Sequence, residues 1–327
     1  MSMVSPVQEW LGHLGGDEAA RPFQSWYEQR RWMERQRAHF GADGVRSDWS
    51  SRLMAPALTV FGRGAGLLGF YGTGVRNALD LRLEALTLSF SDLPPAFDGY
   101  RILHLSDTHL DNLPELAAVA TNLTAGIEVD LLVLTGDVHA NHHAAIAASV
   151  DPLGNLLDTI RVRQRRLAVL GNHDPADMAA ALEKTGFDVL VNRSTVLEKH
   201  GQRLIVTGLD DVHRFFTPEA LRAFKEAPDG FRIALVHSAE VADHAATAGY
   251  ALYLCGHTHG GQICLPGGRA ILTGLRRCRF ASAGLWRQGN MIGYTSRGLG
   301  VGQLPLRFNS RGEITLITLA RSGKASS

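Results

Sequence analysis

Five short motifs in this sequence hold the side chains that could do chemistry. In chain order they are Asp107-Thr108-His109, Gly136-Asp137, Gly171-Asn172-His173-Asp174, His237 and Gly256-His257-Thr258-His259. They supply seven potential metal ligands and leave one histidine over, His173; the ligands are Asp107, His109, Asp137, Asn172, His237, His257 and His259. Mixed carboxylate, amide and imidazole donors without thiolates suit Mn, Fe, Zn or Co. Because seven donors are too many for one tetrahedral ion, the set predicts two divalent ions that share one carboxylate.

The elements that must position these side chains are short apolar runs, most of which end where a motif begins. They cover residues 101–106, 131–135, 167–170, 204–208, 233–236 and 251–255, followed by 291–296 and 314–319. Helix-like stretches at 114–126 and 177–185 separate the first few runs. Buried strands that alternate with helices predict an α/β sheet covered on both faces. Because ligands bind beyond the carboxyl ends of such strands, we expect the motifs to meet at one rim.

Spacing within the motifs supports the same interpretation. Asp-x-His and His-x-His place two donors on one side of an extended chain, because side-chain direction repeats every two residues. The glycines before Asp137, Asn172 and His257 allow the backbone to turn sharply and to approach the ions closely.

The order D-x-H, G-D, G-N-H-D, H, G-H-x-H resembles the calcineurin-like metallophosphoesterases, from about Phe97 to Leu319. One such motif is a weak signal, but five in order, each after a strand, form a strong one. Smaller features are similar to the bacterial membrane-associated phosphodiesterase branch; they are Phe97-Asp98-Gly99, Gly260-Gly261-Gln262 and Arg297-Gly298-Leu299-Gly300. The resemblance implies a four-layer β-sandwich of two mixed sheets flanked by helices.

The resemblance also implies a role for each side chain. One ion would be held by Asp107, His109 and His259, and the other by Asn172, His237 and His257, with Asp137 as the bridge. Two ions about 3.5–4 Å apart bind a hydroxide and a phosphate oxygen together, so the implied reaction is attack of a metal-bridging hydroxide on a phosphomonoester or phosphodiester. His173 would protonate the leaving alkoxide as the general acid.

One position departs from the family pattern. The family continues G-D-x-x-D, and its second Asp pairs with the catalytic histidine, but this chain has Ala140 there. Asp174, Asp111 and Asn141 are the candidates to replace the missing carboxylate.

Other polar residues carry weaker expectations. Arg297 is a candidate to bind the substrate phosphate, and the alternative is an ion pair with a surface acid. His139, His142 and His143 crowd one loop, for which we favour a solvated loop over a third ion.

The composition excludes several classes of protein. The chain has 327 residues, 45% of them hydrophobic and 20% charged, and this length corresponds to about two domains. Its 33 basic and 32 acidic residues give a net charge of +1, which argues against a nucleic-acid partner bound through bulk charge. The three cysteines form no metal-finger or CxxC spacing and fit a reducing compartment. With no secretory signal in the first 20 residues, we expect a cytoplasmic protein, at most peripheral at the inner face of the membrane.

We divide the chain into an Arg/Trp-rich helical extension at 1–80, a phosphoesterase domain at 81–320 and a disordered tail at 321–327. Residues 21–53 carry seven arginines against four acids, which is typical of a helix in peripheral contact with a membrane. The side chains meeting headgroups would be Arg30, Arg31, Arg35 and Arg37, while Trp26 and Trp32 would reach the acyl boundary. We favour the alternative, a helix packed on the main domain. Within the apolar stretch 54–72, Arg63 argues against a transmembrane helix.

The leading interpretation is a metal-dependent phosphoric ester hydrolase that acts on a phosphorylated small molecule or lipid. A related alternative is a hydrolase of a lipid-linked phosphate or pyrophosphate headgroup at the membrane surface. An alternative of another class is a metal-binding interaction module whose catalysis has decayed, which Ala140 would motivate. The complete ligand set and the presence of His173 favour the enzyme.

Overall fold

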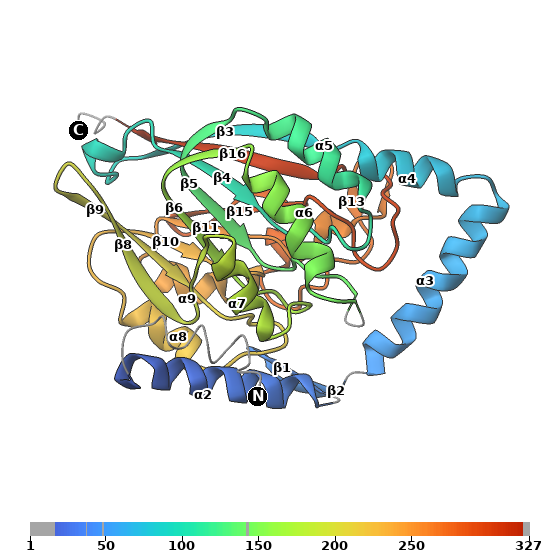
Figure 1. The fold of residues 1–327 in the computed structure, drawn as a ribbon, viewed down its shortest axis with the longest axis horizontal. Helices are drawn as coiled ribbons and strands as arrows, with labels where there is room; N and C mark the ends of the chain where they lie inside the picture. The colour runs from blue at the N-terminus through green and yellow to red at the C-terminus, as the bar shows by residue number, and fades with distance from the viewer. Residues whose placement is uncertain (1–16, 37, 48, 142–143, 323–327) are drawn as a thin grey trace, which may run out of the picture.

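Two six-stranded sheets form the centre of the molecule in this computed structural model, which describes residues 17–36, 38–47, 49–141 and 144–322 (Figure 1). The first sheet has the order β3 (Arg82–Phe90), β16 (Glu313–Arg321), β4 (Arg101–Leu105), β5 (Glu128–Thr135), β6 (Arg161–Val169), β7 (Asp188–Val189). The second has the order β14 (Gly284–Gln288), β15 (Met291–Thr295), β11 (Leu252–Cys255), β10 (Phe231–Leu235), β9 (Gln202–Gly208), β8 (Arg193–Lys199). Both sheets are mixed: β4–β7 are parallel and β9, β10, β11 and β15 are parallel, with antiparallel pairs β16–β4, β8–β9 and β14–β15.

Strand β5 shows why these apolar runs become central strands. Leu131 and Val133 pack between the two sheets, while Leu132 and Leu134 pack on the opposite face under helices. Because successive side chains point to opposite faces, a run without polar residues can be buried on both sides only in a covered strand.

Helices cover the outer face of each sheet and complete four layers. The first sheet is covered by α5 (Glu115–Thr124), α6 (Ala147–Leu157) and α7 (Asp177–Lys184), and the second by α8 (Pro218–Lys225) and α9 (Ala242–Thr247). Short 3₁₀ turns are η1 (Pro95–Phe97), η2 (Ala239–Val241), η3 (His259–Gly261) and η4 (Arg279–Ala281). The predicted α/β four-layer sandwich is confirmed.

The described residues between 17 and 80 lie around this body. Helix α2 (Asp17–Glu34) lies along one side of it, and the hairpin β1 (Ala38–Gly41)–β2 (Gly44–Ser47) bridges to it through Phe40 and Phe215. Helix α3 (Trp49–Leu67) stands away from the sheets, and α4 (Tyr71–Leu79) returns to them (Figure 1). Among the described residues, no helix combines the length and the apolar character needed to cross a bilayer.

Helix α2 is packed on the main body, as the favoured alternative expected. Trp26 is 8% exposed and Arg30 is 1% exposed, and both contact Asp210 of the phosphoesterase domain. The prediction that these two side chains meet lipid is therefore wrong, whereas Trp32 is 49% exposed. The predictions for Arg37, His142, His143 and residues 323–327 concern positions outside the described residues.

Candidate metal centre

The structure brings the predicted ligands together from both sheets. Asp107 follows β4, Asp137 follows β5, and His237 follows β10, so each stands just beyond the carboxyl end of a parallel strand. Two groups of three form, and within each group the potential ligand atoms lie within 4.8 Å of one another. The groups are Asp107, His109, His259 and Asp137, His237, His257. The described residues contain no third group of this kind.

Asp137 stands between the two groups. Its Oδ2 lies 3.3 Å from His237 Nε2 in its own group and 3.8 Å from His109 Nε2 in the other. Asn172 Oδ1 lies 3.1 Å from the same His237 nitrogen, and His257 Nδ1 lies 3.3 Å from it. The amide of Asn172 thus joins the second group.

The backbone of the centre is held in an unusual conformation. Five of the seven predicted ligands have positive φ; they are Asp107 (48°), His109 (39°), Asp137 (55°), His257 (73°) and His259 (50°). L side chains rarely adopt this region, and such conformations persist where the surrounding structure enforces them, typically at functional sites.

Two glycines make the close approach possible, as the sequence predicts. A Cβ on Gly171 would lie 2.1 Å from Asp137 Oδ1, and one on Gly256 would lie 2.1 Å from Asp107 Oδ2. No side chain fits at either position without displacing a predicted ligand.

Hydrogen bonds behind the ligands fix their orientation. His237 Nδ1 lies 2.8 Å from the Thr135 carbonyl, an acceptor that requires a proton on Nδ1 and leaves Nε2 to face Asp137. Asp107 accepts hydrogen bonds from the His257 amide at 3.0 Å and from the Ser106 hydroxyl at 2.6 Å. Each loop is therefore tied to a neighbouring one.

The carboxylates of the centre and its imidazole nitrogens without hydrogen-bond partners are suited to bind divalent cations. Asp107 and Asp137 are almost fully buried, and burial raises the pKa of Asp107. Burial works against ionisation of Asp137 too, but His237 and His173 hold the pKa of that carboxyl well below its usual range. Burial opposes protonation of His237, yet Asp137 raises its pKa to about 10. The ring nitrogens of His109 are buried without a hydrogen-bond partner. Two buried carboxylates and unpartnered imidazole nitrogens form a donor set for metal ions.

His173 lies beside the first group, with its ring centroid 5.6 Å from that of His109. Its backbone amide donates to Asp137 Oδ1 at 2.8 Å. Of the two acidic candidates to replace the acid missing at Ala140, Asp111 is engaged elsewhere, because its carboxylate accepts hydrogen bonds from the backbone amides of Ala140 and Asn141.

Asp174, the other candidate, joins two motif loops through its carboxylate. It accepts hydrogen bonds at 2.8–3.2 Å from four backbone amides, those of Asp137, Val138, His139 and Gly171. Its role is to hold the Gly136-Asp137 loop against the Gly171-Asn172-His173 loop.

Arg297 forms an ion pair with a buried acid. Its Nη1 lies 2.9 Å from Glu313 Oε2, and Glu313 is 3% exposed. The expected alternative was an ion pair with a surface acid, but Glu313 is buried. Contact of Arg297 with a substrate phosphate stays a prediction.

Two buried arginines support the centre and were not predicted from the sequence to do so. Arg307 donates to five backbone carbonyls around the last motif, including that of His259. Arg30 of α2 donates to the carbonyls of Gly171 and Asp174 at 2.8 and 2.7 Å and pairs with Asp210. No local pattern marks Arg30, because its partners are 141 to 180 residues away in the sequence. Arg307 has four of its five acceptors within ten residues, but they converge on it through loop geometry that residue types do not signal.

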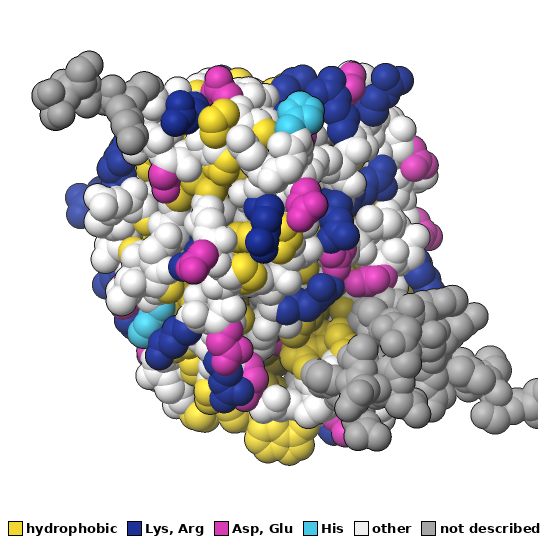
Figure 2. Space-filling model, turned by 90° about the vertical axis from the view of Figure 1, so that its left-hand side faces the viewer, with side chains coloured by type: hydrophobic (Ala, Val, Ile, Leu, Met, Phe, Trp, Pro, Cys, Tyr) yellow, Lys and Arg dark blue, Asp and Glu magenta, His cyan; other side chains and the backbone are white. Residues whose placement is uncertain are grey.

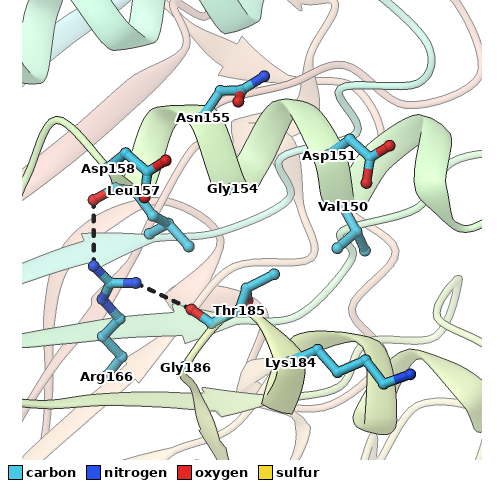
Figure 3. A pocket seen from close by; sticks show the side chains of 10 residues that line it. All are labelled: Val150, Asp151, Gly154, Asn155, Leu157, Asp158, Arg166, Lys184, Thr185 and Gly186. Carbon is cyan, nitrogen blue, oxygen red and sulfur yellow. Dashed lines mark hydrogen bonds between the residues drawn. The ribbon is translucent and has the colours of Figure 1, made fainter.

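Two cavities differ in their relation to these ligands. The one in Figure 3, of about 620 Å³, lies between α6 and α7, where Arg166 donates to the carbonyls of Leu157 and Thr185, and none of the predicted ligands lines it. A second, of about 540 Å³, runs from Gly260, next to His259, to Ala283. This second cavity borders the candidate centre.

Comparisons with known proteins agree with this geometry. Residues 100–261 match the family model of the calcineurin-like phosphoesterases. The metallophosphoesterase YkuE of Bacillus subtilis is 33% identical over 248 residues, which cover 71% of this chain and 83% of the relative. The phosphodiesterase YaeI of Escherichia coli is 28% identical and covers 67% of this chain and 82% of its own. A zebrafish (Danio rerio) transmembrane protein with a metallophosphoesterase domain is 27% identical, over 78% of this chain and 61% of its own. The chain therefore belongs to the calcineurin-like phosphoesterases and is a metal-dependent phosphoric ester hydrolase.

Proposed function

We propose that this protein hydrolyses a phosphomonoester or phosphodiester at a dinuclear centre in which Asp137 is shared by both ions. The observation that carries the proposal is the position of Asp137 Oδ2, 3.3 Å from His237 in one group and 3.8 Å from His109 in the other. A carboxylate in this position can donate to two ions at once.

The remaining ligands divide between the two ions. Asp107, His109 and His259 hold the first, and Asn172, His237 and His257 hold the second. When bound, two divalent ions (Mn, Fe, Zn or Co) supply an acidified water and neutralise the charge of the phosphoryl group. Thr135 and Ser106 keep His237 and Asp107 oriented towards the ions.

His173 acts as the general acid in this proposal. Its amide is fixed by Asp137, and its loop is fixed by Asp174 and Arg30. The imidazolium ring donates its proton to the oxygen of the leaving alkoxide as the phosphorus–oxygen bond breaks.

Replacement of His173 tests this role. His173→Ala should keep both ions but slow hydrolysis of alkyl phosphate esters by about 10²–10⁴-fold. Hydrolysis of nitrophenyl esters should slow much less, because their leaving groups need no proton. The matched control is His200→Ala, an exposed histidine in the β8–β9 turn, which should leave both rates unchanged. An equal loss on both kinds of ester would refute the general-acid role and make His173 a substrate-positioning residue.

A second candidate is hydrolysis of a lipid-linked phosphate or pyrophosphate headgroup. Ile271 and Leu272, both 59% exposed, line the cavity that borders the centre and support an amphipathic substrate. If the protein is instead a metal-binding interaction module whose catalysis has decayed, it should bind metal but hydrolyse none of a panel of phosphate esters. A panel assay with Mn-reconstituted protein distinguishes the three candidates.

A further inference from the structure

Exposed apolar side chains are concentrated in two segments of this protein. The described residues include thirteen large hydrophobic side chains that are exposed, and eleven of them lie in residues 60–71 and 265–285. They are Val60, Phe61, Leu67, Leu68, Phe70 and Tyr71 in the first segment, and Leu265, Ile271, Leu272, Phe280 and Leu285 in the second. Scattered apolar residues on a surface are ordinary, but a concentration of this kind marks a contact site.

Helix α3 has an apolar outer face with no partner among the described residues. Val60, Phe61, Leu67 and Leu68 recur at helical spacing and are 43–90% exposed. The small residues Gly62 and Ala65, on the other side of the helix, are buried. A helix that is apolar on both faces belongs in an apolar environment on both sides.

The two segments are connected by residues 304–309. Leu304 lies against Gly62 of α3, and the Arg307 amide donates to the Gly74 carbonyl of α4 at 3.0 Å. On the other side, the Asn309 side chain donates to the Cys264 carbonyl, at the start of the second segment. Figure 1 shows α3, α4 and β13 (Arg269–Ala270) on the same side of the molecule. We call residues 60–71, 265–285 and 304–309 the apolar face.

The unpaired charge on the apolar face is positive. Residues 49–79 and 244–312 contain no Asp or Glu but eleven arginines. Arg276 and Arg277 pair with Asp43 and Asp243 from outside these ranges, whereas the exposed Arg63, Arg269 and Arg279 form no ion pair within the described part of the chain. Since the whole chain has a net charge of only +1, the rest of the protein is net negative. The opposite end of the molecule, which Figure 2 shows, carries basic and acidic side chains interspersed over its surface.

We infer that the apolar face docks this protein on a membrane surface rich in anionic lipids. Apolar side chains enter the boundary between headgroups and acyl chains, while arginines meet the lipid phosphates. A second copy is disfavoured as the occupant, because the exposed Arg63, Arg269 and Arg279 of two such faces would repel each other. A nucleic acid is disfavoured because seven of the eleven exposed apolar side chains are aliphatic and offer bases no stacking surface. The contact differs from the predicted one at residues 21–53, whose Trp26 and Arg30 are buried.

Docking of this face places the candidate centre at the membrane. The cavity that begins at Gly260 is lined by Arg269, Ile271 and Leu272, which belong to the apolar face. A Cβ on Gly274, in the same lining, would lie 3.0 Å from His257 Nε2.

Cosedimentation with lipid vesicles tests the inference without requiring turnover. The full-length protein is mixed with phosphatidylcholine vesicles or with vesicles of phosphatidylcholine and phosphatidylglycerol at about three to one. We expect pelleting with the anionic vesicles only, and a several-fold loss of binding when salt is raised from 0.1 to 0.5 M, because the Debye length falls below about 5 Å.

Two variants locate the contact. We expect each variant to reduce the bound fraction at least about fivefold. In Leu67→Glu/Leu68→Glu, binding would bury two negative charges among the lipids. In Arg63→Glu, the attraction between the arginine and the anionic lipids becomes a repulsion. Val45→Glu, at a residue that is 69% exposed but outside the face, is the control and should bind as the wild type does. Hydrolysis of bis-p-nitrophenyl phosphate in solution confirms that each variant is folded.

Three results would overturn the inference. They are no pelleting with either vesicle, equal pelleting with both, or binding that the Leu67→Glu/Leu68→Glu change leaves intact. A dimer in light scattering that this variant abolishes would assign the face to a second copy instead.

Discussion

Arg30 should be the most costly single residue to remove from the N-terminal extension. Its guanidinium is 1% exposed, pairs with Asp210 and donates to the carbonyls of Gly171 and Asp174. Breaking a buried ion pair costs about 3–5 kcal/mol, because one charge stays buried without its partner. Trp26 and the Asp211 amide still donate to Asp210, so we expect the lower end, about 3 kcal/mol, for Arg30→Met.

Protonation of Asp210 limits this cost. Burial raises its pKa to about 6 even beside Arg30. Without the guanidinium, the pKa rises further and the carboxyl takes up a proton near neutral pH. Replacing Asp210 as well, in Arg30→Met/Asp210→Asn, should therefore recover part of the lost stability, since the two residues are coupled.

Urea unfolding at pH 7.5 measures the free energy of unfolding of each variant. Arg31→Met is the matched control, because its side chain is 41% exposed and its surface ion pairs contribute less than about 1 kcal/mol. Hydrolysis of an alkyl ester should also fall in Arg30→Met, since the loop of Asn172 and His173 loses two anchors. A loss below about 1 kcal/mol, equal to that of Arg31→Met, would refute the reasoning.

Two further predictions concern the metal ligands. Gly256→Ala should abolish binding of the first ion, because its Cβ would lie 2.1 Å from Asp107 Oδ2; elemental analysis showing a full metal complement would contradict this. Metal binding near pH 7 should release a proton from His237, whose pKa Asp137 raises to about 10, so the apparent affinity should rise up to about tenfold per pH unit between pH 6 and 8. Calorimetry in two buffers of different ionisation enthalpy measures the proton release, and an affinity independent of pH would contradict it.

The grouping of the predicted ligands could be expected from the sequence, because each of them lies in a short motif after a buried strand. The parallel strands β4, β5, β10 and β11 then deliver their carboxyl ends to one place, whatever the detailed packing. The close approach of two glycines to the centre was also expected, because each precedes a predicted ligand in the sequence. Gly256 lies against Asp107, and Gly171 lies against Asp137. The positive φ angles of His109 and His259 could not be expected from the sequence, because neither the residue type nor the spacing signals them.

Contacts between distant segments could not be predicted from the sequence. Arg30 and Asp210 are separated by 180 residues, and an Arg/Trp-rich helix has the same composition whether it covers lipid or a protein surface. Asp174 was proposed as a partner for the missing acid at Ala140, but its oxygens accept from backbone amides. Side-chain hydrogen bonds of this kind depend on loop geometry, which local pattern does not determine.

The central claim is that Asp137 joins two ions in one centre, and the metal content of Asp137→Asn tests it most directly. The wild-type protein, loaded with Mn²⁺ and freed of excess, should hold two ions per chain. The variant keeps the size of the side chain but loses the charge that His237 and His109 share, so we predict that it holds fewer than one ion and loses hydrolysis in parallel. Two ions retained in Asp137→Asn would contradict the account.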